Sequence, residues 1–232
     1  MRPLKFTSLV VLTMIAPKAV FGEKILFIES SPRNEQSQSS KIANKFVKAY
    51  LKDHPKDTVD ILNVWNEELP ELNEDTLAAK DAIMNQVQPS AKQKEAWGKV
   101  AETFKRFASA DKYIISVPVW DFGVPYKLKQ YMDIITQPGL TPLESASSTK
   151  GQLTDKPVVL FHSSGDDYSV GSRAEDLNNR KKTFVRNWLK FIGFKDKDIS
   201  EVSMKGALSP KAKENEQKAL TEAEQLAATW GK

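Results

Sequence analysis

Short apolar runs alternate with longer amphipathic segments along the chain from Lys24 onward. Five of these runs have the length and the β-branched content that favour strands over helices. Strands that stay apolar along their length are typical of a sheet that is buried on both faces. The predicted strands span residues 24–29, 58–65, 112–119, 157–164 and 199–208.

Apolar residues recur at helical spacing in the segments that separate and follow these strands. Ile42 and Phe46 lie on one stripe of the first such segment, and Ser90 is placed to cap the start of the second. The stretch 66–89 is polar and contains Pro70, so no helix is predicted there. The predicted helices span residues 40–53, 90–111, 125–135, 181–194 and 209–230.

Strands that alternate with helices predict an α/β domain, in which helices cover both faces of an open parallel sheet. Five strands in this rhythm are typical of the flavodoxin-like fold, whose strand order is 2-1-3-4-5. Such sheets bind ligands outside the carboxyl ends of the strands, near the point where the strand order reverses. Candidate ligand-binding residues are therefore expected in the loops after the first, third and fourth strands.

The first 22 residues differ from the rest of the chain. Arg2 and Lys5 precede an apolar run, residues 9–16, which is too short to span a bilayer. A basic start, a short apolar run and small residues after it are typical of a secretory signal peptide. We therefore expect residues 1–22 to be a cleaved signal peptide and residues 23–232 to form one flavodoxin-like domain. The mature protein would then be periplasmic or secreted; the alternative is an irregular start to a cytoplasmic protein.

The charge balance argues against nucleic-acid and membrane-surface partners. The chain has 34 basic and 30 acidic residues, and residues 1–22 hold three of the basic ones and no acidic one, so the remainder has a net charge of +1. We therefore expect neither nucleic-acid binding nor stable membrane insertion of the mature chain. The absence of cysteine excludes disulfides and thiolate chemistry, and two histidines are too few for a histidine-rich metal site.

The loop after the first strand, "SSPRNEQSQSSK", is rich in hydroxyl groups and leads directly into a helix. It has neither a Walker nor a dinucleotide-binding glycine pattern. The free N–H groups and positive dipole end of a helix start suit a phosphate, and four side chains here could add donors. Simple capping of the helix by a serine is the alternative, and it is favoured for this stretch alone. The four residues are Ser31, Ser37, Gln38 and Ser39.

Two further loops follow the third and fourth strands. In "PVWDFGVPYKLKQYMD", Trp120 and Phe122 either cover core or form a wall for a flat ligand. In "HSSGDDYS", Gly165 either allows close approach of a ligand or belongs to an ordinary turn, and His162 is interpreted as a packing or hydrogen-bonding residue. Hydroxyls for a phosphate, aromatics for a ring and a glycine turn for the ring's polar edge together fit FMN.

With these motifs the chain resembles the FMN-dependent NADH:quinone and azo-dye reductases of the flavodoxin-like fold, over about residues 24–230. The resemblance rests on "SSPRNEQSQS", on "PVWDFGVPYKLKQYMDII" with the following "PGLT", and on "NWLKFIGF". The middle motif is the most specific. The residues that it keeps from the family pattern are Pro118, Trp120, Phe122, Pro125, Leu128, Lys129 and Asp133.

The resemblance implies a role for each loop. The phosphate of FMN would be held by Ser31, Ser37, Gln38 and Ser39. The isoalloxazine would be lined by Val119, Trp120, Asp121 and Phe122. Its polar edge would be met by Ser163, Ser164, Gly165 and Asp166. No catalytic side chain and no metal are implied, because the chemistry takes place at flavin N5.

The family also implies an activity and an assembly. Hydride would pass from NADH or NADPH to the flavin and then, in a second half-reaction, to a quinone or an azo compound. The protein would be a homodimer with its site at the interface. Two alternatives remain open: an FMN-binding electron carrier that is not an enzyme, and a scaffold without flavin. The reductase motif and the lack of an acidic surplus argue against the carrier.

Overall fold

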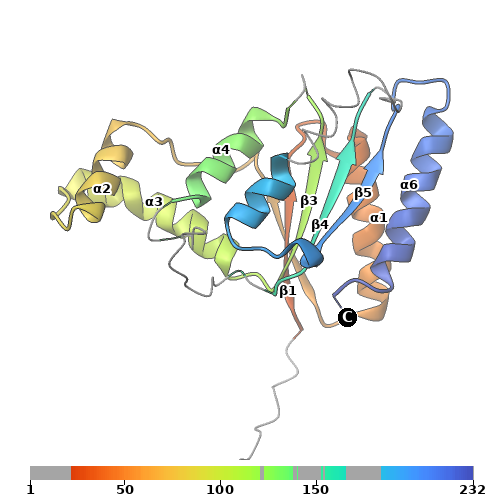
Figure 1. The fold of residues 1–232 in the computed structure, drawn as a ribbon, viewed down its shortest axis with the longest axis horizontal. Helices are drawn as coiled ribbons and strands as arrows, with labels where there is room; N and C mark the ends of the chain where they lie inside the picture. Colours follow the sequence, from red (N-terminus) through yellow and green to blue (C-terminus); the bar gives the residue numbers. More distant parts are fainter. Residues whose placement is uncertain are drawn as a thin grey trace, which may run out of the picture.

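The computed structural model describes residues 22–120, 123–137, 140, 153, 155–165 and 184–231. Within them, five strands pair in parallel in the order β2-β1-β3-β4-β5 (Figure 1), which confirms the predicted fold class and strand order. The strands are β1 Lys24–Glu29, β2 Thr58–Asn63, β3 Lys112–Pro118, β4 Val158–Ser163 and β5 Ile199–Met204.

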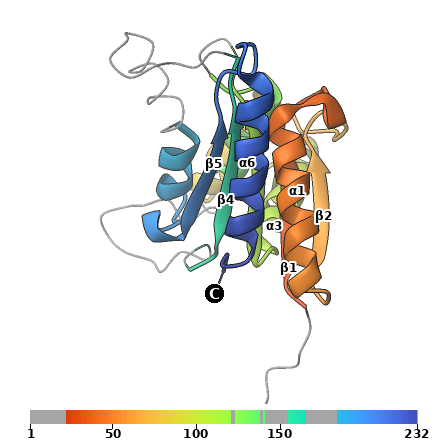
Figure 2. The same cartoon turned by 90° about the vertical axis from the view of Figure 1, so that its right-hand side faces the viewer.

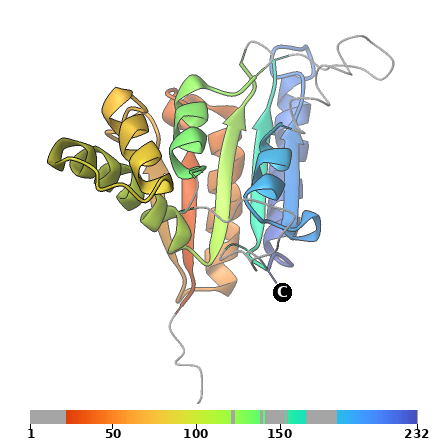
Figure 3. The same ribbon diagram turned by 60° about the vertical axis from the view of Figure 1, so that its left-hand side comes forward.

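Helices cover both faces of the sheet. Figure 2 shows α1 and α6 side by side on one face, whereas α3, α4 and the helical residues 184–191 cover the other. Helix α2 packs against α3, and this pair of helices extends beyond the β2 edge of the sheet (Figure 3). The bounds are α1 Gln38–Asp53, α2 Glu74–Met84, α3 Ala91–Ala108, α4 Tyr126–Ile135 and α6 Ala212–Ala227.

The alternation of side chains along each strand divides the core into two layers. On β1, Leu26 and Ile28 belong to the core layer under α3 and α4, whereas Ile25 and Phe27 belong to the layer under α1 and α6. All four side chains are fully buried. A strand covered on both faces can be apolar at every position, which explains why β1 could be recognised as a short continuous apolar run.

The structure differs from the sequence-based expectation between β2 and α3. β2 ends at Asn63, two residues before the predicted end, because the Asn63 side chain accepts a hydrogen bond from the backbone N–H of Trp65 and starts a turn. Helix α2 lies in the stretch where no helix was predicted. It begins after Asn73, its cap, and two of its apolar residues, Leu77 and Met84, are exposed, so it lacks a clear apolar stripe.

The start of α3 was predicted correctly. Ser90 is its N-cap and forms a capping box with Gln93. The start of α4 is one residue later than predicted, with Pro125 in the cap position. After β4, residues 184–191 confirm part of the predicted helix 181–194, and Gly193 follows it with a φ of 108° that favours glycine.

A buried lysine joins the two ends of the described chain at the amino edge of the sheet. Lys112 is 3% exposed; its ammonium donates to the hydroxyl of Tyr50 at 2.8 Å and pairs with Glu23 at 2.6 Å. The rings of Tyr50 and Trp230 lie within 5.4 Å of the same ammonium. Burial, followed by the hydrogen bond to Asp57, raises the pKa of Tyr50. Glu23, Tyr50 and the two aromatic rings thus stabilise the ammonium of Lys112, whose burial without partners would be costly.

Candidate functional site

Three loops leave the carboxyl edge of the sheet, at the top of Figure 1. Hydrogen bonds tie each loop to a neighbouring strand. Ser30, after β1, donates from its hydroxyl to the carbonyl of Ser116 in β3. The backbone N–H of Val119, after β3, donates to the carbonyl of Ser163 in β4 at 2.8 Å, and Ser164 donates to Met204 in β5 at 3.0 Å. The three loops singled out from the sequence are therefore neighbours in space.

The β1 loop places its serines at the start of α1. Ser31, Ser37 and Ser39 are buried, each at most 4% exposed. Ser37 is the N-cap of α1: its hydroxyl accepts from the N–H of Ser40 at 3.5 Å and lies 3.1 Å from the hydroxyl of Ser39. The capping interpretation is thus confirmed for Ser37.

The same helix start keeps polar groups available. Among the described residues, the backbone N–H groups of Gln38 and Ser39 have no hydrogen-bond acceptor, and the buried Oε1 atom of Gln38 has no partner either. The N–H groups of a first helical turn have no acceptor within the helix, and together with the helix dipole they attract an anion. This arrangement has the donor chemistry that a phosphate needs.

Residues that the sequence analysis did not select hold this loop in place. Asn34 has a left-handed φ of 46°, and its side-chain oxygen accepts from the amide of Asn63 at 3.0 Å. Ser40 approaches Ser116, with 3.4 Å between their hydroxyl oxygens. Burial raises the pKa of Glu29, the last residue of β1, and a hydrogen bond with Asn63 opposes that shift.

The β3 loop contributes aromatic side chains. Trp120 is half-buried, and two backbone hydrogen bonds with Gly123 close a turn. Its ring centroid lies 5.9 Å from that of Trp65, which follows β2 and lies 5.0 Å from the ring of Tyr126. Trp120 thus contacts another aromatic at the edge of the sheet and is not part of either core layer. Asp121 and Phe122 lie outside the described residues.

The β4 loop pairs with the segment after β5. Ser163 and Ser164 are buried, and the carbonyls of Ser164 and Gly165 accept hydrogen bonds at 2.9 Å from the N–H groups of Ala207 and Leu208. A Cβ atom at position 165 would lie 2.9 Å from the Leu208 side chain, so this glycine leaves room for that side chain. Within the described chain the close neighbour of Gly165 is thus Leu208, and the approach of a ligand to Gly165 stays a prediction. Asp166 lies outside the described residues.

His162 lies beneath this loop, in β4. Its Nε2 atom is 4.0 Å from a carboxylate oxygen of Glu201, whose other oxygen accepts from Arg186 at 2.9 Å. The imidazole is nearly fully buried, which agrees with the interpretation of His162 as a packing residue. A cavity of about 10 Å³ borders His162, Ser163 and Val119, and a space of that size holds about one water molecule. A flat cofactor would therefore lie over the loops and not within this cavity.

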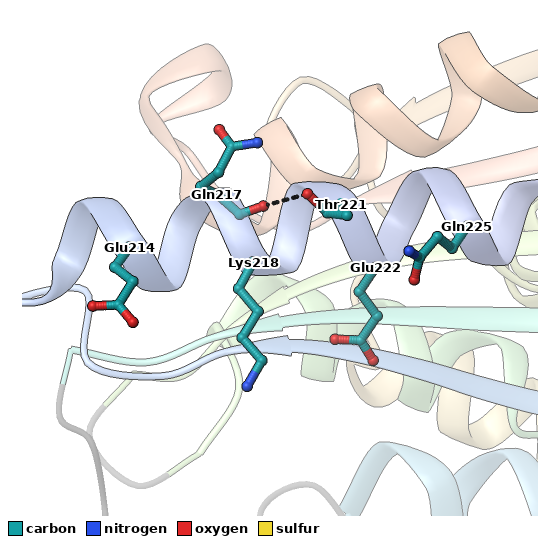
Figure 4. Close-up of a pocket in the computed structure, with 6 residues that line it drawn as sticks. All are labelled: Glu214, Gln217, Lys218, Thr221, Glu222 and Gln225. Carbon is teal, nitrogen blue, oxygen red and sulfur yellow. Dashed lines mark hydrogen bonds between the residues drawn. The ribbon is translucent and has the colours of Figure 1, made fainter.

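A second depression lies along the outer side of α6 (Figure 4). All of its lining side chains come from this one helix and are exposed, and they include Lys218 between Glu214 and Glu222. A ligand site requires polar groups that converge from several elements, so this surface has the character of a solvated helix face. Across the described ranges no cluster of metal-ligating side chains is present. No helix of those ranges is long and apolar enough to cross a membrane.

Comparisons with known proteins agree with this arrangement. The model of the family described as the flavodoxin-like fold matches residues 23–227. An FMN-dependent NADH:quinone oxidoreductase of Desulfotalea psychrophila is 37% identical over 174 residues, which are 75% of this chain and 81% of that protein. FMN-dependent NADH:quinone oxidoreductase 2 of Pseudomonas syringae pv. tomato is 35% identical over 206 residues, which are 88% of this chain and 97% of that protein.

A solved structure with the same architecture is that of azoreductase from Bacillus anthracis str. Sterne. It has a TM-score of 0.77 and 26% identity, and the match covers 90% of this chain and 100% of that one. Family model, relatives and fold thus agree over nearly all of the chain after residue 22. The chain therefore belongs to the flavodoxin-like fold family, on the branch that holds the FMN-dependent NADH:quinone oxidoreductases.

Proposed function

We propose that this protein is an FMN-dependent oxidoreductase that takes two electrons from NADH or NADPH and delivers them to a quinone or an azo compound by a ping-pong mechanism. The observation that carries the proposal is the convergence of three loops at the carboxyl edge: a buried hydroxyl cluster at a helix start, an aromatic turn and a paired β4 loop. The names of the relatives support FMN as the cofactor, NADH as the donor, and a quinone or an azo compound as the acceptor.

The residues of the edge have the donor chemistry that FMN requires. The free N–H groups of Gln38 and Ser39, with the hydroxyls of Ser31 and Ser37, would bind the phosphate at the positive end of α1. Trp120 would cover a face of the ring and exclude water. When bound, FMN supplies a ring that accepts hydride from a nicotinamide and passes two electrons to the second substrate.

A purified sample of the chain tests this function directly. We expect the protein to be yellow, with a flavin absorption spectrum, and to reduce menadione with NADH as the donor. A yellow protein that NADH does not reduce would favour the electron carrier, because binding would be present without the hydride transfer. A colourless protein that takes up no added FMN would favour the scaffold without flavin and would contradict the proposal.

The paired substitution Ser37→Ala and Ser39→Ala tests the phosphate site. Losing even one charge-assisted hydrogen bond costs about 1.5–3 kcal/mol, so the Kd for FMN should rise by at least about tenfold. Ser90→Ala is the matched control, because Ser90 caps α3 as Ser37 caps α1. It should cost about 1 kcal/mol of stability and leave the FMN affinity unchanged. An unaltered Kd in the double variant would contradict the assignment of the phosphate site.

We further propose that residues 1–22 are removed as a signal peptide and that the mature protein is exported. The basic start and the short apolar run support this. N-terminal sequencing of the natively produced protein should begin at Glu23 or close to it. A mature chain that still begins at Met1 or Arg2 would refute the proposed cleavage.

A homodimer is also proposed. Leu77, Ile83, Met84 and Val87, in α2 and the turn after it, are 43–61% exposed, and α2 stands away from the sheet (Figure 3). Exposed apolar clusters mark interaction surfaces. Sedimentation analysis should therefore find a dimer that Ile83→Lys with Met84→Lys dissociates. Phe191→Lys, at an apolar residue of the helical segment 184–191 that is 46% exposed, is the control and should leave the dimer intact.

A further inference from the structure

The end of β2 and the turn after it form hydrogen bonds with the end of β1 and the loop that follows β1. Three consecutive residues make them. The amide of Asn63 donates to the side chain of Asn34 at 3.0 Å, the N–H of Val64 donates to the carbonyl of Glu29 at 3.0 Å, and the indole N–H of Trp65 donates to the carbonyl of Ser30 at 2.9 Å. The loop that carries the candidate phosphate site is thus braced by its neighbour in the sheet.

The indole of Trp65 also reaches the second loop. Its ring is 5.9 Å from Trp120, tilted by 46°, and meets Tyr126 nearly edge-on at 5.0 Å. Tyr126 is the first residue of α4 and is 65% exposed. Edge-to-face and tilted aromatic pairs at these separations are attractive. One side chain therefore connects the hydroxyl loop after β1 with the aromatic loop after β3.

We propose that Trp65 is a positioning residue for the cofactor, an inference that rests on the proposed function. Its N–H fixes the backbone at Ser30, one residue before the phosphate-binding serines begin, and its ring supports Trp120 against the flavin. Tryptophan suits both tasks because it combines a large rigid ring with a single donor. Phenylalanine at this position keeps ring packing and loses the donor, whereas leucine loses both.

Trp188 offers a matched control within the same chain. It is half-buried like Trp65, packs against the same core layer, and its indole donates to the hydroxyl of Thr136 at 2.8 Å. Thr136 follows the far end of α4, ten residues after Tyr126, which corresponds to roughly 15 Å along a helix. Trp188→Phe thus removes an equivalent hydrogen bond away from the candidate site.

The experiment compares Trp65→Phe, Trp65→Leu and Trp188→Phe by three measurements: the Kd for FMN, the visible circular dichroism of the bound flavin, and the stability without FMN. Trp65→Phe should raise the Kd about three- to tenfold, the effect of one lost neutral hydrogen bond. Trp65→Leu should raise it further and change the flavin dichroism, because the support of Trp120 is lost. Trp188→Phe should lower stability to a similar extent as Trp65→Phe while keeping the parental Kd and dichroism.

Each outcome separates this inference from the function on which it rests. If the unsubstituted protein binds FMN and both Trp65 variants keep its Kd and dichroism, Trp65 has no positioning role. The same holds if Trp188→Phe changes both as much as the Trp65 variants do, because the effect would then be one of general stability. If the unsubstituted protein binds no FMN, the proposed function and this inference are both overturned. Should Trp65→Leu fail to fold, Trp65→Phe decides the matter.

Discussion

The parallel pairing of β1 with β3 is the constraint on which the candidate site depends. These strands are hydrogen-bonded neighbours although β2 lies between them in the sequence, and Glu29 is in register with Ser116. Beyond that point the chain leaves to opposite faces of the sheet, because α1 follows β1 onto one face and α4 follows β3 onto the other. The two loops separate above a common edge, as is usual for ligand sites in sheets of this kind.

Hydrogen bonding at this edge is asymmetric in a way that suits a ligand. The buried serines Ser30 and Ser37 find partners in β3 and at the start of α1, as buried hydroxyl groups must to offset their loss of water. The N–H groups of Gln38 and Ser39 gain no such partner in the described chain. The packing that fixes the loop therefore leaves its first-turn donors free for an anion.

The other end of the sheet is tied by side chains. Lys112 joins Glu23 and Tyr50 and lies between two aromatic rings, so the charged group at the amino edge is matched within the protein.

Along the β2 edge, Arg106 of α3 forms a two-point contact with Asp60 and a further hydrogen bond with Glu67. The hydrogen bond from this guanidinium lowers the pKa of Asp60 against the opposing effect of burial. These contacts anchor α3, and with it α2, to the sheet.

The amino-acid sequence determined the features that depend on neighbouring residues. The apolar run of β1, the stripe of α1 and the cap at Ser90 follow from periodicity and local hydrogen bonding, and the rhythm of strands and helices was enough to predict the sheet order. It also indicated the hydroxyl, aromatic and glycine loops. Helix α2 was not predicted, because apolar residues such as Leu77 and Met84 are exposed. Its apolar residues therefore do not form a single stripe at helical spacing that the sequence could reveal.

Tertiary structure alone decided how the loops meet. Trp65 was read as the end of a strand, and its contact with Ser30 spans 35 positions of the chain. No local pattern encodes a bond between residues so far apart, since it arises only when β1 and β2 pair and carry their ends to one edge. The contact between Gly165 and Leu208 likewise arises only when β5 pairs with β4, since the Leu208 side chain then lies where a side chain at position 165 would be. The residue types at the strand ends determine which hydroxyl, aromatic and backbone groups can serve a ligand. The pairing of the strands determines which of these residues contact one another.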